Sequence, residues 1–179
     1  ETGVLVLIDG QAPIIVSPTG TQLKWSKNAV AVNTNVGSDY SKAYVDYTGK
    51  TRTAAIIAKG TELFGDNKSE WNQYAPAWCN AYDRSYDKGD EAHTKIGIGA
   101  GQWWLPSIAE LIIIWKHKYA INQCLSVISG ASPLVESWHW SSTEYSATNA
   151  WGLTLSDGLT GWTAKVSNST YVRAVAAFH

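Results

Sequence analysis

Methionine is absent from this 179-residue sequence, and phenylalanine and cysteine occur only twice each. Cys79 and Cys124 are too few for a disulfide scaffold, so they either pair with one another or remain two buried thiols. The 14 Lys and Arg residues balance the 15 Asp and Glu residues to a formal charge of -1. That balance argues against a nucleic-acid-binding surface, which needs clustered cations to neutralise phosphates.

Long apolar runs are also missing, and none approaches the roughly 20 residues that span a bilayer. The chain therefore has no predicted membrane span. Because no Met stands at position 1, residues 1–3 are expected to be a processed or cloning-derived start, with any secretion signal already removed.

The motifs of common active sites and metal sites are missing as well. No G-x-S-x-G elbow presents a nucleophilic serine, and the glycines of residues 96–101 lack the spacing and the following Lys of a phosphate loop. The His residues are scattered instead of standing with Cys at zinc-ligand spacing. The acidic segment 83–91 lacks the alternate-residue spacing of a calcium loop and is expected to be a solvated charge run. We therefore expect no enzymatic activity, no cofactor and no metal site.

Trp and Tyr, by contrast, are abundant, with ten and nine copies. Each combines a large apolar area with a polar handle, which suits partly exposed sheets and binding faces. Most of the Trp residues are nevertheless expected in the core. The chain shows no linker or shift in composition and is long enough to bury a substantial core, so residues 1–179 are expected to form one domain.

Short strands and a few helices are predicted along the chain. Apolar runs bounded by turn residues predict strands at 4–8, 14–17, 29–33 and 44–47. Helices are predicted at 51–59 and 76–82, followed by a helix that begins at Ser107. There, Ser107 and Glu110 form the pattern of a capping box, and apolar residues at helical spacing from Ile108 to Tyr119 give this helix a core face. A shorter helical piece is predicted at 121–128. This pattern predicts an α+β fold with two main helices and short antiparallel sheets.

The stretch from Trp138 to Phe178 has the clearest β pattern. Alternation places Trp151, Leu153 and Leu155 on one face of a strand. The dipeptide Asp157-Gly158 then predicts a two-residue hairpin turn, which would set Leu153 opposite Trp162 and Trp151 opposite Ala164. One face of this hairpin is heavy and apolar. The other face carries a mixture of small and polar residues, namely Gly152, Thr154, Leu159, Gly161 and Thr163.

Several motifs in the chain resemble one known family. They are W-S-S-T-E-Y at 140–145, N-A-W at 149–151, S-D-G at 156–158, Y-V-R-A-V at 171–175 and W-W-L-P-S-I-A-E-L at 103–111. Together they resemble the C-type-lectin-like variable proteins of bacteria and phages, which diversity-generating retroelements diversify by adenine errors. The resemblance implies a C-type-lectin-like fold of the kind also found in formylglycine-generating enzymes. Those enzymes need a cysteine pair near the C-terminal part of the chain, and no thiol follows Cys124 here, so the resemblance implies binding without catalysis.

The implied target is a protein or glycan on a cell surface. The implied location is extracellular, on a cell or a phage particle, as part of a pilus, an envelope or a phage tail. Calcium-dependent sugar binding is not expected, because the Glu-Pro-Asn or Gln-Pro-Asp loop and the Trp-Asn-Asp strand of sugar-binding C-type lectins are absent.

In this family diversification acts mostly at Asn codons, within a segment that corresponds to residues 138–178. Ten residues of that segment are reachable by adenine changes and form the expected ligand-binding set, to which Trp138 is added as an exposed aromatic anchor. The ten are His139, Thr148, Gly152, Thr154, Leu159, Gly161, Thr163, Val166, Ser169 and Thr170. Trp codons are not reachable in this way, so Trp140, Trp151 and Trp162 are expected to be fixed core residues. The alternative is a fixed surface or filament domain whose exposed face is not diversified.

Overall fold

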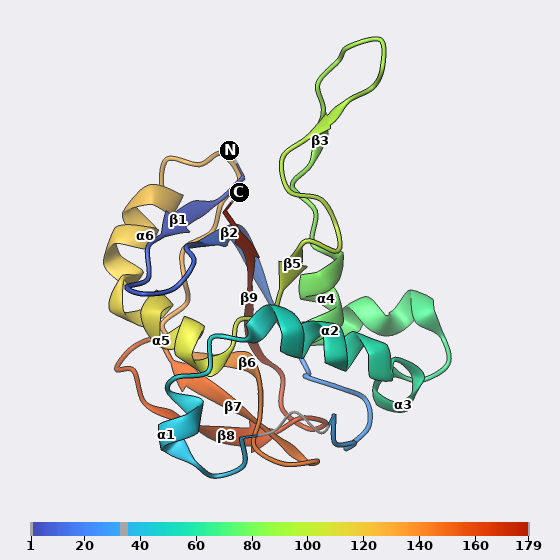
Figure 1. The fold of residues 1–179 in the computed structure, drawn as a ribbon, viewed down its shortest axis with the longest axis vertical. Coiled ribbons are helices and arrows are strands. Elements are labelled where there is room, and N and C mark those ends of the chain that lie inside the picture. The colour runs from blue at the N-terminus through green and yellow to red at the C-terminus, as the bar shows by residue number, and fades with distance from the viewer. Residues whose placement is uncertain (1, 33–35, 179) are drawn as a thin grey trace.

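The computed structural model describes residues 2–32 and 36–178 (Figure 1). Its main sheet is built from β1 (Val4–Val6), β2 (Ile14–Leu23), β5 (Trp103–Trp104), β6 (Trp138–Glu144), β7 (Asn149–Thr154), β8 (Thr160–Ala164) and β9 (Thr170–Ala177). The strand order is β1-β2-β9-β6-β7-β8, and β5 also pairs with β9. The pairs are antiparallel except for β6 and β9, which meet in parallel at His139 and Tyr171.

The helices pack around this sheet. They are α1 (Tyr40–Ala43), α2 (Gly49–Lys59), α3 (Thr61–Phe64), a 3₁₀ helix η1 (Lys68–Gln73), α4 (Ala75–Ala81), α5 (Ile108–Lys116) and α6 (Lys118–Leu125). In Figure 1, α2, α3 and α4 lie to the right of β9, and α5 and α6 lie to its left. The short strands β3 (Tyr86–Asp87) and β4 (Lys95–Ile96) pair with each other in an arm that projects away from the body. The molecule is therefore α+β, as the sequence predicts.

The start of α5 confirms the predicted capping box. The Ser107 hydroxyl accepts the backbone N–H of Glu110 at 3.4 Å, and the Glu110 carboxylate accepts the backbone N–H of Ser107 at 2.9 Å. These two bonds satisfy backbone donors that the first helical turn leaves free. The helix ends at Lys116 and α6 begins at Lys118, so the helical phase is broken between them. Tyr119, expected on the core face, is 74% exposed for this reason.

Two predicted strands are wrong. Residues 29–32 and 44–47 form no strand, and residue 33 lies outside the described residues. Instead, the Asp39 carboxylate caps α1 by accepting the backbone N–H groups of Ser41 and Lys42 at 3.0 and 3.2 Å. The chain then turns inward at Asp46, which is only 6% exposed. This segment is fixed by hydrogen bonds to the Asp46 side chain, and not by the backbone hydrogen bonds of a strand.

Indole rings hold the centre of the molecule together. Trp25, Trp140 and Trp151 have no exposed surface, and the N–H of each donates to a backbone carbonyl in a distant segment at 2.9–3.0 Å. A buried indole with its N–H paired contributes a large apolar area without the cost of an unmet donor. These rings tie the C-terminal strands to the N-terminal half of the chain.

The two cysteines do not form a disulfide. Cys79 is buried and Cys124 is exposed, and both are free. Burial raises the pKa of the Cys79 thiol well above its ordinary value, as expected for a group whose charged form loses its hydration. The pairing alternative is therefore excluded, and only one of the two thiols is a core residue.

Among the described residues, no helix has the length and apolar character needed to cross a bilayer. Within residues 2–32 and 36–178, no three His, Cys, Asp or Glu side chains gather in a group that could hold a metal ion.

Candidate ligand-binding surface

The turn between β7 and β8 is longer than the predicted two-residue turn. The Thr154 N–H donates to Leu159 O at 2.9 Å, and the Gly158 N–H donates to Thr154 O at 2.8 Å. Four residues, 155–158, therefore form the turn, and Trp151 pairs with Trp162. The predicted register is wrong by two residues. Because two is an even number, every side chain still points to the face that the sequence pattern assigned to it.

Packing against α5 explains this longer turn. Leu155 is 1% exposed, so its side chain is packed in the core. Leu155 belongs to the turn, because β7 ends at Thr154. Gly158 has a φ of +80°, and a Cβ at this position would lie only 2.4 Å from the indole of Trp115 on α5. The close approach of Gly158 to Trp115 needs a glycine, since both the positive φ and the lack of space disfavour a side chain.

The predicted binding residues gather on the face of β6, β7 and β8 that we call the glycine face, namely Trp138, Gly152, Thr154, Gly161 and Thr163. Gly152 pairs with Gly161, and Trp138 pairs with Thr154. The indole of Trp138 lies over both glycines, because a Cβ at Gly152 would lie 2.5 Å from Trp138 Nε1 and a Cβ at Gly161 would lie 3.3 Å from Trp138 Cη2. Trp138 is thus half-buried, and its Nε1 is buried without a hydrogen-bond partner.

The structure leaves eight of the eleven predicted residues at least partly accessible. Thr148, Leu159 and Ser169 are exposed, and the half-buried ones are Trp138, Thr154, Gly161, Thr163 and Val166. Three predicted residues are buried instead, namely His139, Gly152 and Thr170. Gly152 is covered by the Trp138 ring, and Thr170 pairs with Leu23 where β9 begins.

His139 is the largest departure among the predicted binding residues, with 2% exposure. Its ring stacks on Tyr171, with 5.6 Å between ring centroids, and its Nδ1 lies 2.9 Å from the Ser137 carbonyl oxygen. Burial, with a smaller contribution from the nearby Arg173 guanidinium, lowers the pKa of His139 to about 4 against the opposing effect of the Ser137 contact. The imidazole is therefore a neutral core group and does not reach the surface where a ligand would bind.

This burial predicts a loss of stability in acid. The folded pKa of His139, about 4, lies below its ordinary value of 6.5, so the unfolded chain takes up the proton first as pH falls. The contribution of His139 to stability is present above pH 6.5 and is lost toward pH 4. The loss amounts to about 2–3 kcal/mol near pH 4.5. Chemical unfolding of the wild type and of His139→Gln between pH 7.5 and 4.5 measures this. The variant is expected to lose less stability than the wild type, and equal losses would contradict the assignment.

Glu110 changes stability with pH in the direction opposite to His139, and its effect must be separated from that of His139. Its pKa is raised to about 6, chiefly by burial. Its contribution to stability is present in acid, where the carboxyl is protonated, and is lost as pH rises through 6. The effect of His139→Gln must therefore be read as the difference between the two pH profiles, in which the Glu110 contribution cancels.

Trp162 is the second correction. It was expected in the core and is 50% exposed. It lies on β8, the last strand of the sheet, and its ring stacks on Tyr145 with 5.0 Å between centroids. Its neighbour Trp151, on the next strand inward, is covered by Tyr40 and Tyr145. Among the residues that the structure describes, no further strand pairs with β8 to cover Trp162.

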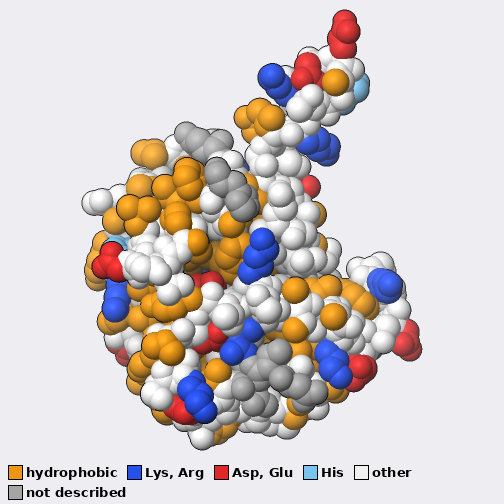
Figure 2. Space-filling view, viewed as in Figure 1, with side chains coloured by type: hydrophobic (Ala, Val, Ile, Leu, Met, Phe, Trp, Pro, Cys, Tyr) orange, Lys and Arg blue, Asp and Glu red, His pale blue; other side chains and the backbone are white. Residues whose placement is uncertain are grey.

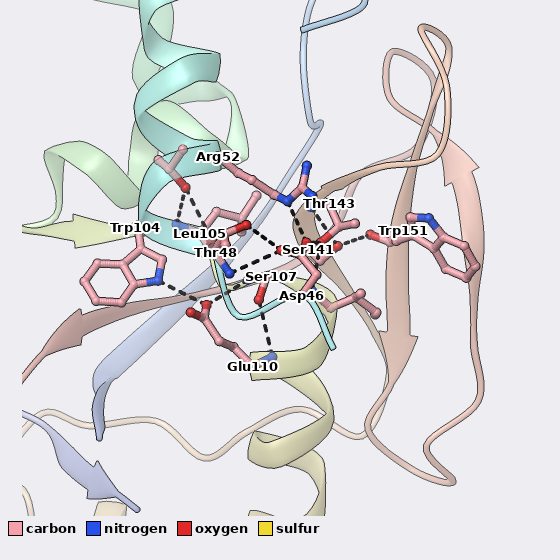
Figure 3. A network of polar contacts seen from close by, with 12 residues as sticks. Asp46, Thr48, Arg52, Trp104, Leu105, Ser107, Glu110, Ser141, Thr143 and Trp151 are labelled. Carbon is pink, nitrogen blue, oxygen red and sulfur yellow. Dashed lines mark hydrogen bonds and ion pairs between the residues drawn. The ribbon is translucent and has the colours of Figure 1, made fainter. Parts of the chain in front are cut away.

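A buried polar network holds the strands and helices beneath these faces (Figure 3). Asp46 Oδ2 accepts hydrogen bonds from Arg52 Nε at 2.6 Å and from Thr143 Oγ1 of β6 at 2.7 Å. In the same region Ser141 Oγ donates to the Trp151 carbonyl at 2.8 Å. Asp46 thereby connects the segment after α1 to α2 and to β6.

Glu110 forms the other half of the network. Its carboxylate accepts the indole N–H of Trp104 at 3.1 Å as well as the Ser107 N–H. These donors belong to the start of α5 and to β5. The carboxyl group with the raised pKa is therefore the one that caps α5. The geometry gives Glu110 a role in holding α5 against the sheet.

The aromatic residues Tyr40, Tyr44 and Tyr145 were not among the predicted binding residues, although all three lie beside the hairpin. Tyr40 contacts Trp151 with 4.7 Å between ring centroids, and the Tyr44 hydroxyl lies 2.6 Å from Thr160 Oγ1. The density of Tyr between positions 40 and 47 was the one available signal, and the strand predicted there concealed it.

No protein-family model and no curated protein matches the sequence. Among solved structures the fold is similar to that of a fimbrial protein from Bacteroides ovatus ATCC 8483, with a TM-score of 0.58 and 15% sequence identity. The similarity covers 92% of this chain and 35% of that protein, so the chain spans about a third of the length of the fimbrial protein. The two share an α+β fold.

Proposed function

We propose that this chain is a non-enzymatic binding domain, displayed at a cell or phage surface, that contacts a protein or glycan through the glycine face. One observation carries the proposal. Within a single hairpin, Trp151 and Leu153 have no exposed surface, whereas Thr154 and Thr163 reach the solvent and Leu159 is 64% exposed. Core residues and accessible residues of the hairpin thus occupy opposite faces, apart from the buried Gly152 and the exposed Trp162. A rigid scaffold that positions variable contacts is a common design for recognition.

The similarity to a fimbrial protein supports the location. Fimbriae are surface fibres, and a domain of this fold that makes up about a third of such a protein is compatible with display outside the cell. The motif resemblance to lectin-like variable proteins supports the binding role. From the same resemblance we propose that residues 138–178 are diversified.

A double substitution on the glycine face tests the binding role. Thr154 and Thr163 are half-buried on the glycine face. Thr154→Arg with Thr163→Arg therefore adds bulk and charge to the contact surface while leaving Gly152 and Gly161, over which the Trp138 ring lies, unchanged. Fluorescent tetramers of the domain are incubated with panels of bacterial and epithelial cells and counted by flow cytometry. We expect the double variant to lose at least about tenfold in binding, since interface centres tolerate unpaired charge poorly.

The matched control places the same charge elsewhere, as Thr51→Arg with Ser129→Arg, two exposed positions on α2 and after α6. The control is expected to bind as the wild type does, and near-ultraviolet circular dichroism confirms folding of both variants. Equal binding by the glycine-face variant and the wild type would refute the proposal, as would wild-type tetramers that bind no cell type in the panels.

A fixed filament domain is the second candidate, and an apolar groove favours it. A hollow of about 270 Å³ lies between β1 and α6, lined by residues that include Val4–Leu7 and Ile121. Leu5 and Leu7 are 45% and 71% exposed, and Figure 2 shows hydrophobic side chains gathered over the β1–α6 end of the molecule. Such a surface is typical of a contact between subunits.

The surrounding DNA separates the two candidates. A near-copy of the segment that encodes residues 138–178, differing at adenines and standing beside a reverse transcriptase gene, supports a diversified binding site. A locus with no such copy favours the filament domain.

A further inference from the structure

Exposed aromatic side chains gather on the face of the C-terminal sheet opposite the glycine face. We call this the aromatic face. It consists of the exposed Tyr40, Tyr44 and Trp162, the half-buried Tyr145, and Thr160 between them. Trp162 is 50% exposed, Tyr40 48% and Tyr44 43%. Exposed apolar side chains that gather in one place mark an interaction site more often than scattered single residues do.

The aromatic face is held rigid by the core beneath it. Tyr145 packs edge-on against the buried Trp151 with 5.7 Å between centroids and stacks flat against Trp162 with an interplanar angle of 28°. Tyr40 also packs edge-on against Trp151, and the Tyr44 hydroxyl is hydrogen-bonded to Thr160. Since these rings are already fixed, a ligand would bind without the entropic cost of ordering them.

A hollow of about 320 Å³ continues from this face toward α5. Tyr44 and Thr160 belong to both, and Tyr47, Trp115 and Lys116 line the rest of the hollow with two isoleucines and Gly158. Its volume lies at the lower end of the roughly 300–1,000 Å³ range of small-molecule sites. The hollow is therefore large enough for a small ring-shaped group.

The chemistry of these surfaces selects the ligand. Among the described residues that line the hollow, Lys116 alone is charged, and on α1 the Lys42 ammonium is paired with Asp39 at 3.4 Å. The polar groups are mainly hydroxyls of Tyr44, Tyr47 and Thr160, each of which can donate and accept. The remaining surface consists of flat aromatic rings. A pyranose presents a matching combination, with neutral hydroxyls around its edge and an apolar C–H face.

We propose that the aromatic face and its hollow bind a neutral oligosaccharide, with one pyranose stacked on Trp162 and the next seated between Tyr44 and Trp115. The binding needs no metal ion. In the part of the lining that the structure describes, an anionic glycan would find one cation, Lys116, and a cationic ligand would find no carboxylate. The site is distinct from the glycine face, because Trp162 and Trp138 lie on opposite sides of the sheet.

A glycan array tests this proposal with neutral oligosaccharides of glucose, mannose, galactose and N-acetylglucosamine, and with acidic glycans and immobilised peptides as comparisons. Isothermal titration then measures affinity for the best neutral binder. Trp162→Ala is expected to weaken binding by about 30-fold or more, the usual loss for an aromatic hot spot. Tyr86→Ala is the matched control, because Tyr86 is 57% exposed on the projecting arm, and it should leave the affinity unchanged.

A second variant guards against a folding defect. Trp162→Phe keeps a stacking ring, so it is expected to bind with intermediate affinity. It should also lose the part of the sugar-induced fluorescence change that comes from Trp162, while the part from Trp115 remains. Thr154→Arg with Thr163→Arg should keep full sugar affinity, which separates this site from the glycine face. The proposal is overturned if no neutral oligosaccharide binds, if acidic glycans or peptides bind instead, or if Trp162→Phe and Trp162→Ala retain wild-type affinity.

Discussion

Replacing Lys165 with Met is expected to lower the free energy of unfolding by about 3–5 kcal/mol, the usual cost of leaving a buried charge without its partner. Lys165 and Glu144 form an ion pair in which neither side chain has any exposed surface. The Lys165 ammonium also donates to the Val30 carbonyl at 3.2 Å and lies 4.4 Å from the centroid of the Trp25 ring. The Glu144 carboxylate in turn accepts the Val32 N–H at 3.1 and 3.2 Å.

The size of this effect follows from desolvation. Burial lowers the pKa of Lys165, and its hydrogen bond and ion pair with Glu144 oppose that shift. Removing Lys165 leaves the Glu144 carboxylate in the core with the Val32 N–H as its one remaining donor among the described residues. A carboxylate in such surroundings is costly. In a chain of this length the loss corresponds to a fall of roughly 6–20 °C in the unfolding temperature.

Urea unfolding of three variants makes the measurement. Lys165→Met and Glu144→Gln are each expected to be strongly destabilised, whereas the double variant Lys165→Met with Glu144→Leu should recover most of the loss, because apolar replacements remove both charges together. Lys59→Met is the control, since the Lys59–Glu62 pair is partly exposed and is expected to contribute less than about 1 kcal/mol. A Lys165→Met variant as stable as Lys59→Met would show that the buried pair is unimportant.

The second large effect is expected for Asp46→Ala, at about 3–5 kcal/mol. The carboxylate accepts the Thr48 N–H at 3.2 Å in addition to its bonds from Arg52 and Thr143, and its side chain is 4% exposed. Without it the Arg52 guanidinium, 11% exposed, loses its acidic partner. The segment that carries Tyr44 and Tyr47 also loses its attachment to β6.

Asp39→Ala provides the comparison for Asp46→Ala. Asp39 also accepts backbone N–H groups, but it caps the short helix α1 at the surface, so its loss is expected to cost about 1 kcal/mol. Both variants are compared by thermal and urea unfolding. If Asp46→Ala were no more destabilising than Asp39→Ala, the network of Figure 3 would not be the tie between α1, α2 and β6 that its geometry indicates.

Local patterns predicted the parts of the fold that depend on neighbouring residues. The capping box at Ser107 and Glu110 satisfies backbone donors within one helical turn, so the sequence alone reveals it. The division of the β7–β8 hairpin into two faces was also predictable, because it depends only on alternation. It held even though the register was wrong, since the slip of two residues preserves the faces.

The parts that sequence could not predict depend on what covers each face. Alternation placed Trp162 with Trp151, yet Tyr40 comes from more than a hundred residues away to cover Trp151 and leaves Trp162 at the sheet edge. In the same way, His139 is buried by its contact with Tyr171 on β9, a pairing that no local pattern encodes. The aromatic face was missed because its members meet only in the folded chain.

A randomised display library tests the central claim that fixed and displayed positions are divided within the C-terminal sheet. One sublibrary varies the displayed residues Thr148, Thr154, Leu159, Thr163 and Ser169, and another varies the buried residues Trp140, Trp151, Leu153 and Ala174. Cells that display folded protein are sorted and sequenced, and then sorted again for binding to the cell panels. The account predicts that the displayed set tolerates most substitutions in the folding sort yet changes target binding, while the buried set fails the folding sort. A displayed set that unfolds as often as the buried set, or that never alters binding, would contradict it.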